Sequence, residues 1–256
     1  MKKNLYYRAT DGRKNSIKDA IFSFFYSLSH YPRILLEVFI RKNFGERYFT
    51  LSAALVNFVV LFFVPLAIDS LHSMRSFGGR SSMGGTILTN ITWYIFLAAY
   101  LYFSIQRRKE ITTSKTMYDF TKYSLYDGDY DPRLKAIKIN GKLVDNRQLE
   151  ILIEPAAFLA IGIILTLCAQ MVGILLIVSS IIYSLSYSWA YRHGDNFVLD
   201  KIDEMISIKQ FHKSFVEGID TDYKVRGNRP VDPEYRNDIA NECIVDDDFE
   251  NQTYAV

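Results

Sequence analysis

The stretch that decides the fold runs from residue 151 to residue 191 and reads ILIEPAAFLAIGIILTLCAQMVGILLIVSSIIYSLSYSWAY. It holds two apolar runs, residues 151–169 and 172–191, with only two residues between them. An α-helix rises about 1.5 Å per residue, so a run of this length crosses a hydrocarbon layer of about 30 Å. The only charged residue in the stretch is Glu154. We therefore expect two membrane-spanning helices joined by a tight turn.

Two further apolar runs lie upstream, at residues 50–68 and 86–105. The alternative is that all four runs form helices buried in a soluble core. Helices that are apolar on every side need a large covering layer of protein, and the rest of this 256-residue chain is too short to supply one. The sequence thus predicts an all-α membrane protein with four transmembrane helices arranged as two hairpins.

The distribution of basic residues orients these helices. Residues 1–49 and residues 106–150 each carry 10 Lys and Arg, and the segment after residue 191 carries 8. The link between the first and second runs carries only Arg75 and Arg80. Because Lys and Arg stay on the cytoplasmic side of a membrane, we expect both termini to be cytoplasmic.

The remaining segments divide between the membrane surface and the cytoplasm. We expect six parts: cytoplasmic interfacial helices (1–49), a first transmembrane hairpin (50–105), a cytoplasmic loop (106–150), a second transmembrane hairpin (151–191), a cytoplasmic helix (192–219) and a disordered acidic tail (220–256). Within the loop, Asn140-Gly141 lies between alternating apolar and polar residues and predicts a small β-hairpin.

The segment before the first run mixes aromatic and basic residues around Pro32, which we expect to separate two short helices. These helices are predicted to lie on the inner leaflet with basic side chains toward anionic headgroups. The headgroup-facing candidates are Lys14, Lys18, Arg41 and Lys42. The alternative is that the helices dock on a partner protein.

The fourth run carries a stripe of small residues, Ser180, Ser184 and Ser188, which recur every four positions. Small residues at this spacing let helix backbones approach closely, so they are helix-packing candidates. Trp189 and Tyr191 follow near the cytoplasmic end, where amphipathic rings favour the membrane interface.

Glu154 has two interpretations. With Pro155 it is typical of a first helical turn, where a carboxylate facing the helix dipole reaches water at the headgroup level. Alternatively it faces the interior of the helix bundle as part of an ion pathway. We favour the first interpretation because no apolar run carries another ionisable residue near its middle.

Signatures of catalysis are absent from the sequence, which contains no P-loop, GxGxxG, HExxH or GxSxG motif. The spacing of Cys168 and Cys243 fits neither a metal site nor a disulfide. The net charge of +2 does not favour a nucleic-acid binder. We therefore expect no enzyme activity, no cofactor, no metal and no direct contact with nucleic acid.

Four segments, FGERYFTLSAAL (44–55), IQRRKEI (105–111), YDFTKYSLYDGD (118–129) and ILIEPAAFLAIG (151–162), follow one another along the chain. In this order they resemble uncharacterised multi-span proteins carried near conjugation genes on bacterial mobile elements. The resemblance covers roughly residues 44–175. It implies a bacterial inner-membrane location and an accessory role in DNA transfer.

Two functions are compatible with these features. The first is an integral membrane scaffold or accessory subunit that docks cytoplasmic or membrane partners, which the resemblance associates with a conjugation or secretion system. The second is a small oligomeric channel or transporter that uses Glu154 and the polar residues of the spans. The expected partners are the lipid bilayer and either other proteins or further copies of the chain.

Overall fold

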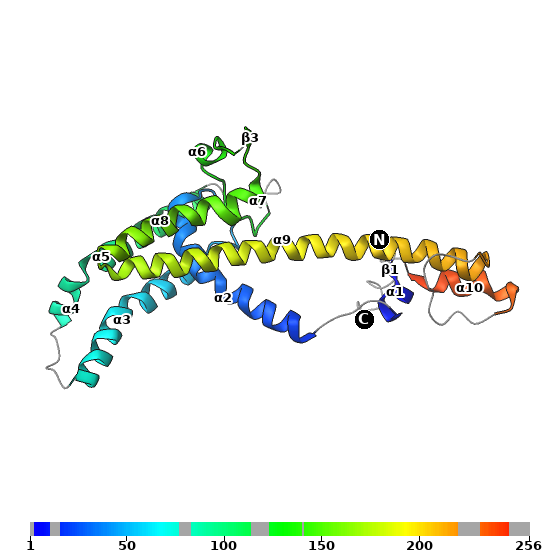
Figure 1. The fold of residues 1–256 in the computed structure, drawn as a ribbon, viewed down its shortest axis with the longest axis horizontal. Coiled ribbons are helices and arrows are strands. Elements are labelled where there is room, and N and C mark those ends of the chain that lie inside the picture. Colours follow the sequence, from blue (N-terminus) through cyan, green and yellow to red (C-terminus); the bar gives the residue numbers. More distant parts are fainter. Residues whose placement is uncertain are drawn as a thin grey trace. The chain divides into compact units, whose positions relative to one another are not determined.

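A computed structural model of the protein describes residues 3–10, 16–76, 83–113, 123–139, 141–219 and 231–245 (Figure 1). Over these residues the chain is all-α. It forms two compact units. The larger unit is Phe22–Ala190, and the smaller one combines Met1–Ile21 with Tyr191–Val256.

The larger unit holds most of the apolar helices. Its elements are α3 (Leu51–Ser76), α4 (Met83–Thr89), α5 (Ile91–Thr113), α6 (Pro132–Lys135), α7 (Asn146–Gln148), a π-helical turn (Leu149–Ile153) and α8 (Glu154–Leu167). Helices α2 (Ser16–Ile40) and α9 (Met171–Phe211) contribute residues to both units. The smaller unit adds α1 (Leu5–Thr10), a π-helical turn (His212–Val216) and α10 (Pro233–Glu242).

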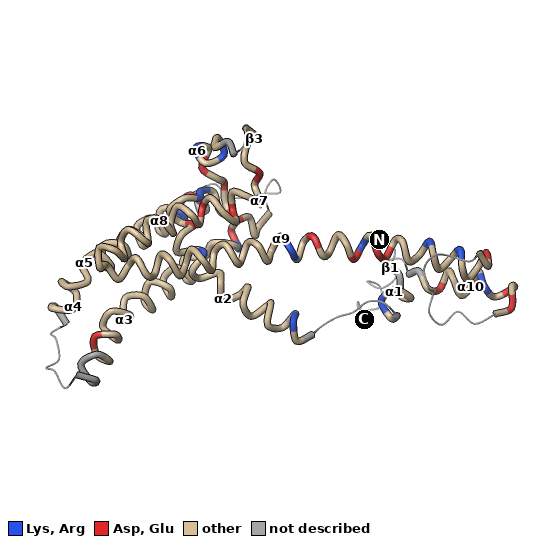
Figure 2. The backbone as a smooth tube through the Cα atoms, in the orientation of Figure 1, with Lys and Arg blue, Asp and Glu red and all other residues tan. Residues whose placement is uncertain are grey.

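Three helical segments among the described residues are long and apolar enough to cross a membrane: Leu51–Leu71, Asn146–Leu167 and a stretch within Met171–Val216. Figure 2 shows α8 and the first part of α9 nearly free of charge. These segments indicate a membrane protein. They correspond to the first, third and fourth predicted spans.

The second predicted span is not among these three. The helix over this run is interrupted at Asn90, between α4 and α5. The Asn90 side-chain amide donates to the backbone carbonyl of Thr86 at 3.0 Å. The apolar part of α5 therefore starts at Ile91 and ends before Arg107. Four spans stay a prediction for this reason.

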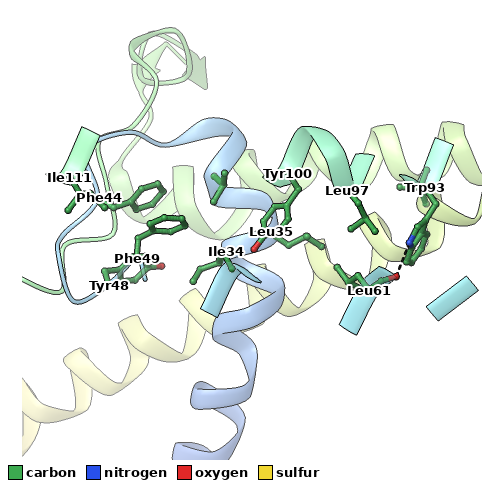
Figure 3. Close-up of a cluster of buried hydrophobic side chains, with 13 residues drawn as sticks. Ile34, Leu35, Phe44, Tyr48, Phe49, Leu61, Trp93, Leu97, Tyr100 and Ile111 are labelled. Atoms are coloured by element: carbon green, nitrogen blue, oxygen red, sulfur yellow. Dashed lines mark hydrogen bonds between the residues drawn. The ribbon is translucent and has the colours of Figure 1, made fainter. Parts of the chain in front are cut away.

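The core of the larger unit forms where α2, α3 and α5 meet (Figure 3). Its buried side chains include Ile34, Leu35, Phe44, Tyr48, Phe49, Leu61, Trp93, Leu97 and Tyr100. The Trp93 indole nitrogen donates to the Leu61 carbonyl at 3.0 Å, which joins α5 to α3.

The predicted break at Pro32 is wrong, because α2 continues through this residue to Ile40. A proline inside a helix removes one backbone hydrogen bond. Ile34 and Leu35, two and three residues after it, are each only 1% exposed. Burial of this C-terminal half stabilises the helix despite the lost bond.

Among the described residues, the named strands are two residues long and pair antiparallel. Strand β2 (Lys138–Ile139) pairs with β3 (Lys142–Leu143), and β1 (Lys3–Asn4) pairs with β4 (Ile244–Val245). Each pairing is a minimal two-stranded sheet. Residue 140 lies outside the described residues, so the predicted β-hairpin around Asn140-Gly141 stays a prediction.

In the smaller unit, α9 continues as one helix through the expected boundary near residue 191. Helix α1 packs on it through the rings of Tyr6 and Phe211, whose centroids lie 4.5 Å apart.

The tail was expected to be disordered from residue 220, but Pro233–Glu242 is helical. Asp232 caps this helix by accepting from the backbone N–H of Glu234. Residues 220–230 and 246–256 lie outside the described residues.

Candidate functional site

A stripe of polar residues runs along the C-terminal half of α2. Ser29, Arg33 and Glu37 recur every four residues and share one face of the helix. Arg41 follows directly after the helix end at Ile40 and continues the spacing, because its backbone N–H still donates to the Glu37 carbonyl at 2.7 Å. All four are buried, and Glu37 and Arg41 have no exposed surface. A buried charge is strongly unfavourable unless it is paired and hydrogen-bonded. Each member of the stripe must therefore have partners on other elements.

Arg41 has the most partners. Its guanidinium contacts the Glu154 carboxylate at 2.5 Å and the Asp127 carboxylate at 2.8 Å. It also donates to the Tyr187 hydroxyl at 2.7 Å and lies 3.4 Å from a Glu150 oxygen. Burial alone would lower the pKa of Arg41, but the surrounding tyrosine and carboxylate oxygens raise it above its ordinary value. The side chain therefore stays charged, and it joins α2 to α8, to α9 and to the loop that carries Asp127.

Glu154 lies at the first residue of α8 and is only 1% exposed. Besides Arg41, its carboxylate accepts a hydrogen bond from the Tyr183 hydroxyl of α9. The interpretation in which Glu154 reaches water is therefore wrong. Its partner, Arg41, follows directly after α2 and lies outside the predicted spans. The ion-pathway role of Glu154 stays a prediction.

A second group of contacts surrounds Arg33. This side chain pairs with Glu37 at 3.3 Å and donates to the Tyr48 hydroxyl at 2.6 Å. The Tyr48 hydroxyl in turn donates to Glu37 at 2.6 Å. Burial, reinforced by the negative charge of Glu37, raises the pKa of Tyr48 well above its ordinary value. Tyr187 connects the two groups, because its hydroxyl lies 2.8 Å from Glu37 as well as next to Arg41.

The end of the stripe nearest Ser29 contacts α9 directly. The Ser29 hydroxyl donates to the Ser186 hydroxyl at 3.0 Å, and Arg33 donates to the same oxygen at 3.1 Å. The Arg33 guanidinium also lies over the Tyr187 ring, 4.2 Å from its centroid, in a cation–π contact. One face of α2 is thus held along one face of α9.

The loop of residues 123–130 completes the site. Its backbone pairs with the segment of residues 42–48, with Gly45 N–H donating to Tyr126 at 2.8 Å and Asp129 N–H donating to Lys42 at 2.7 Å. A side chain at Gly45 would collide with this loop, because its Cβ would lie 2.6 Å from the Tyr126 nitrogen. The close backbone approach brings Asp127 to Arg41.

Two tyrosines of the same loop bind carboxylates. The Tyr130 hydroxyl donates to Glu150 at 2.6 Å, and the Tyr126 hydroxyl donates to Asp129 at 2.7 Å. Burial and the carboxylate bond raise the pKa of Tyr130 above its ordinary value. The same two causes, in the same order, raise the pKa of Tyr126 to about 12. Both hydroxyls therefore stay protonated donors at physiological pH.

These contacts hold α2, α8, α9 and the loop of residues 123–130 together. We call this arrangement the Arg41 network and define it by the basic residues Arg33 and Arg41, the acidic residues Glu37, Asp127, Glu150 and Glu154, and the hydroxyls of Tyr48, Tyr130, Tyr183 and Tyr187. Among the described residues, no group of His, Cys, Asp or Glu side chains is arranged to hold a metal ion. Hydrogen bonds within the network occupy both oxygens of Glu37 and of Glu154.

Two of the three predicted helix-packing residues join α9 to α8 and to the π-helical turn before it. Ser180 donates to the Pro155 carbonyl, and Ser184 donates to the Ile151 carbonyl at 2.7 Å. Ser188 is half-buried. Farther along the same pair of helices, a Cβ on Gly162 would lie 3.0 Å from the Gly173 oxygen, which shows how closely the two backbones approach.

The predicted membrane-interface residues are not brought together. Arg41 lies in the interior, whereas Lys18 and Lys42 are exposed. Trp189 is half-buried, with its ring centroid 3.5 Å from that of Phe22. Tyr191 is half-buried in the smaller unit, and Lys14 lies outside the described residues.

Sequence reasoning missed most of the Arg41 network. The available signal was the four-residue spacing of Ser29, Arg33, Glu37 and Arg41, which repeats that of the serine stripe in the fourth apolar run. No protein-family model, curated protein or solved structure matches the chain. The function is therefore argued from the geometry.

Proposed function

We propose that the chain is an integral membrane scaffold or accessory subunit that holds a partner protein at one side of the membrane. The observation that carries this proposal is the loop of residues 123–130. Its backbone is tied to residues 42–48, yet Tyr123 and Leu125 are 86% and 60% exposed. A fixed loop that presents large apolar side chains outside the apolar helices is typical of a protein-binding surface.

The same pairing supports a four-span topology. Residues 42–48 lie just before α3, and residues 123–130 lie after α5. Segments whose backbones are hydrogen-bonded to each other must lie on the same side of a membrane. If α3 crosses once, the chain must return before residue 123, and α5 is the only long helix among the described residues in between. The bias of Lys and Arg supports a cytoplasmic location for this side and for both termini.

The setting of the scaffold follows from the sequence resemblance. Uncharacterised multi-span proteins near conjugation genes lie in bacterial inner membranes, so we propose the same location for this chain. An accessory role in DNA transfer then gives the partner its class, a component of a conjugation or secretion system.

The alternative, a small channel or transporter, is less well supported. Two cavities in the larger unit, about 430 and 380 Å³ in volume, have no charged side chain among their lining residues. Glu154 is bound by Arg41 and Tyr183 and lines neither cavity. These contacts favour a structural role for the Arg41 network. Ion flux into liposomes that is lost on Glu154→Gln, in protein that stays monodisperse, would support the channel instead.

The scaffold is tested by photo-crosslinking in native membranes. A photoreactive amino acid replaces Tyr123 or Leu125, and Arg47 serves as a matched control because it is exposed on the paired segment. We expect one discrete protein, identified by mass spectrometry, to crosslink at Tyr123 and Leu125 and not at Arg47. The scaffold is refuted if these sites yield only lipid adducts or the same background as Arg47.

A further inference from the structure

Helix α9 has an exposed apolar face that follows a coiled-coil spacing. Within its apolar run the exposed residues Ile174, Val178, Ile181 and Leu185 are separated by alternating steps of four and three. Lipid accounts for this part of the face. The same steps continue through Ser188, Arg192, Asp195, Leu199, Ile202 and Ile206.

Beyond residue 191 lipid no longer accounts for the exposed face, on the topology proposed above. Leu199, Ile202 and Ile206 are 56%, 40% and 41% exposed. Val198 and Met205, which flank this seam, are 56% and 57% exposed. Charged residues surround them along the sequence, so this is a cytoplasmic segment with an uncovered apolar seam.

The chain itself covers the opposite face of α9. Glu204 is 6% exposed and lies 3.8 Å from Arg8 of α1, and Phe211 contacts Tyr6 of the same helix. Glu204 and Phe211 are seven residues apart and lie across the helix from the seam. Among the described residues, helix α1 therefore lies on the side of α9 opposite Leu199, Ile202 and Ile206, which stay exposed.

We infer that the seam of α9 beyond residue 191 binds a second copy of this chain in parallel. Copies inserted in one bilayer with the same topology run in the same direction and at the same depth. Each seam residue then meets its own counterpart, which is the arrangement of a parallel two-stranded coiled coil. Confinement to the bilayer raises the effective concentration of the second copy, so a short seam suffices.

The charges in the seam support a second copy as the partner. Arg192 and Asp195 occupy adjacent layers of the same seam, three residues apart. In a parallel pair the two arginines of one layer lie next to the two aspartates of the next layer, and the four charges cancel. Polar residues at such seam positions fix the register of a coiled coil.

The first experiment is disulfide crosslinking of the full-length protein in native membranes. Cys168 and Cys243 are replaced by serine, and single cysteines are introduced as Leu199→Cys, Ile202→Cys or Ile206→Cys. Asp200→Cys is the matched control, because Asp200 is also exposed but points away from the seam. We expect several-fold more disulfide-linked dimer at the three seam positions than at Asp200. Equal yields at all four positions would mean random collision and would overturn the inference.

The second experiment tests register by exchanging charges. Arg192→Asp alone and Asp195→Arg alone each place four like charges together, so each should lower the yield of the Ile202→Cys dimer. The double exchange restores neutrality and should restore the yield. A double exchange that stays as low as the single ones would contradict the parallel pairing.

The inference rests on the proposed membrane topology, but its failure is distinguishable from failure of the scaffold. Seam cysteines that link only to a different protein, or to none, refute the second copy and leave the crosslinks of Tyr123 untouched. Seam dimers with no partner at Tyr123 support the inference and refute the scaffold.

Discussion

Replacing Arg41 by methionine removes the centre of the buried network at nearly constant side-chain volume. Glu154 and Glu150, which are 1% and 3% exposed, then lose their shared guanidinium. Removing one partner of a buried ion pair costs about 3–5 kcal/mol, because the remaining charge is left buried and unpaired. We therefore predict that Arg41→Met lowers the free energy of unfolding by about 4 kcal/mol.

Glu154→Gln provides the second arm of a double-mutant cycle. The amide keeps the shape of the side chain and one acceptor oxygen, so we expect a loss of about 2 kcal/mol, the range for a hydrogen bond to a charged group. In the double variant the loss of the Arg41 guanidinium leaves no unpaired carboxylate at position 154, because the glutamine there is neutral. The two losses should therefore not add, and we expect a coupling of about 2 kcal/mol between the two positions.

The assay is equilibrium unfolding in mixed micelles followed by tryptophan fluorescence. Trp93 is 3% exposed and Trp189 is half-buried, so both report on packing of the larger unit. Lys42→Met is the matched control, because Lys42 is the exposed neighbour of Arg41 and its replacement should change stability by less than about 0.5 kcal/mol. Equal stabilities of Arg41→Met and Lys42→Met, or strictly additive single losses, would refute the stabilising role of the Arg41 network.

Two further predictions concern backbone approach and pH. Gly45→Ala should destabilise the protein by about 1–3 kcal/mol in the same assay, because its Cβ would lie 2.6 Å from the Tyr126 nitrogen. Gly194→Ala, with no atom within 4 Å of its Cβ, should instead stabilise α9 by about 0.5–1 kcal/mol, and a loss as large as that of Gly45→Ala would contradict this account. The folded state raises the pKa of Tyr126 to about 12, so the protonated hydroxyl contributes its full stabilisation below pH 10. This contribution should be lost as the pH rises toward 12. Unfolding titrations over this range should therefore show a smaller loss for Tyr126→Phe than for the unmodified chain, and equal losses would contradict the shift.

The apolar helices could be predicted from the sequence because their signal is local. Length and hydropathy alone give the segments Leu51–Leu71, Asn146–Leu167 and the start of α9. The break at Asn90 was missed because an asparagine in a long apolar run adds little to an average. The continuity of α2 through Pro32 was missed because it depends on burial of the residues that follow.

The Arg41 network could not be predicted from the same signals. Arg41 and Glu154 are 113 positions apart, so nothing local indicates that they meet. The rule that places arginine at lipid headgroups assigned Arg41 to the surface. Glu154 was recognised as unusual, but its partner Arg41 lies at the end of α2, outside the apolar runs. A search for charged residues at helical spacing in the segments flanking the spans would have found the stripe of α2.

We propose that residues 42–48 and the loop of residues 123–130 lie on the same side of a membrane, with α3 and α5 crossing between them. The most direct measurement is labelling of single cysteines by a membrane-impermeant maleimide in spheroplasts, before and after permeabilisation. The positions are Glu46→Cys, Tyr123→Cys and the native Cys168, all of them exposed in the structure. The account predicts that Cys168 reacts from outside, and that positions 46 and 123 react only after permeabilisation. If positions 46 and 123 were labelled from opposite sides, the four-span arrangement and the pairing that supports it would be contradicted.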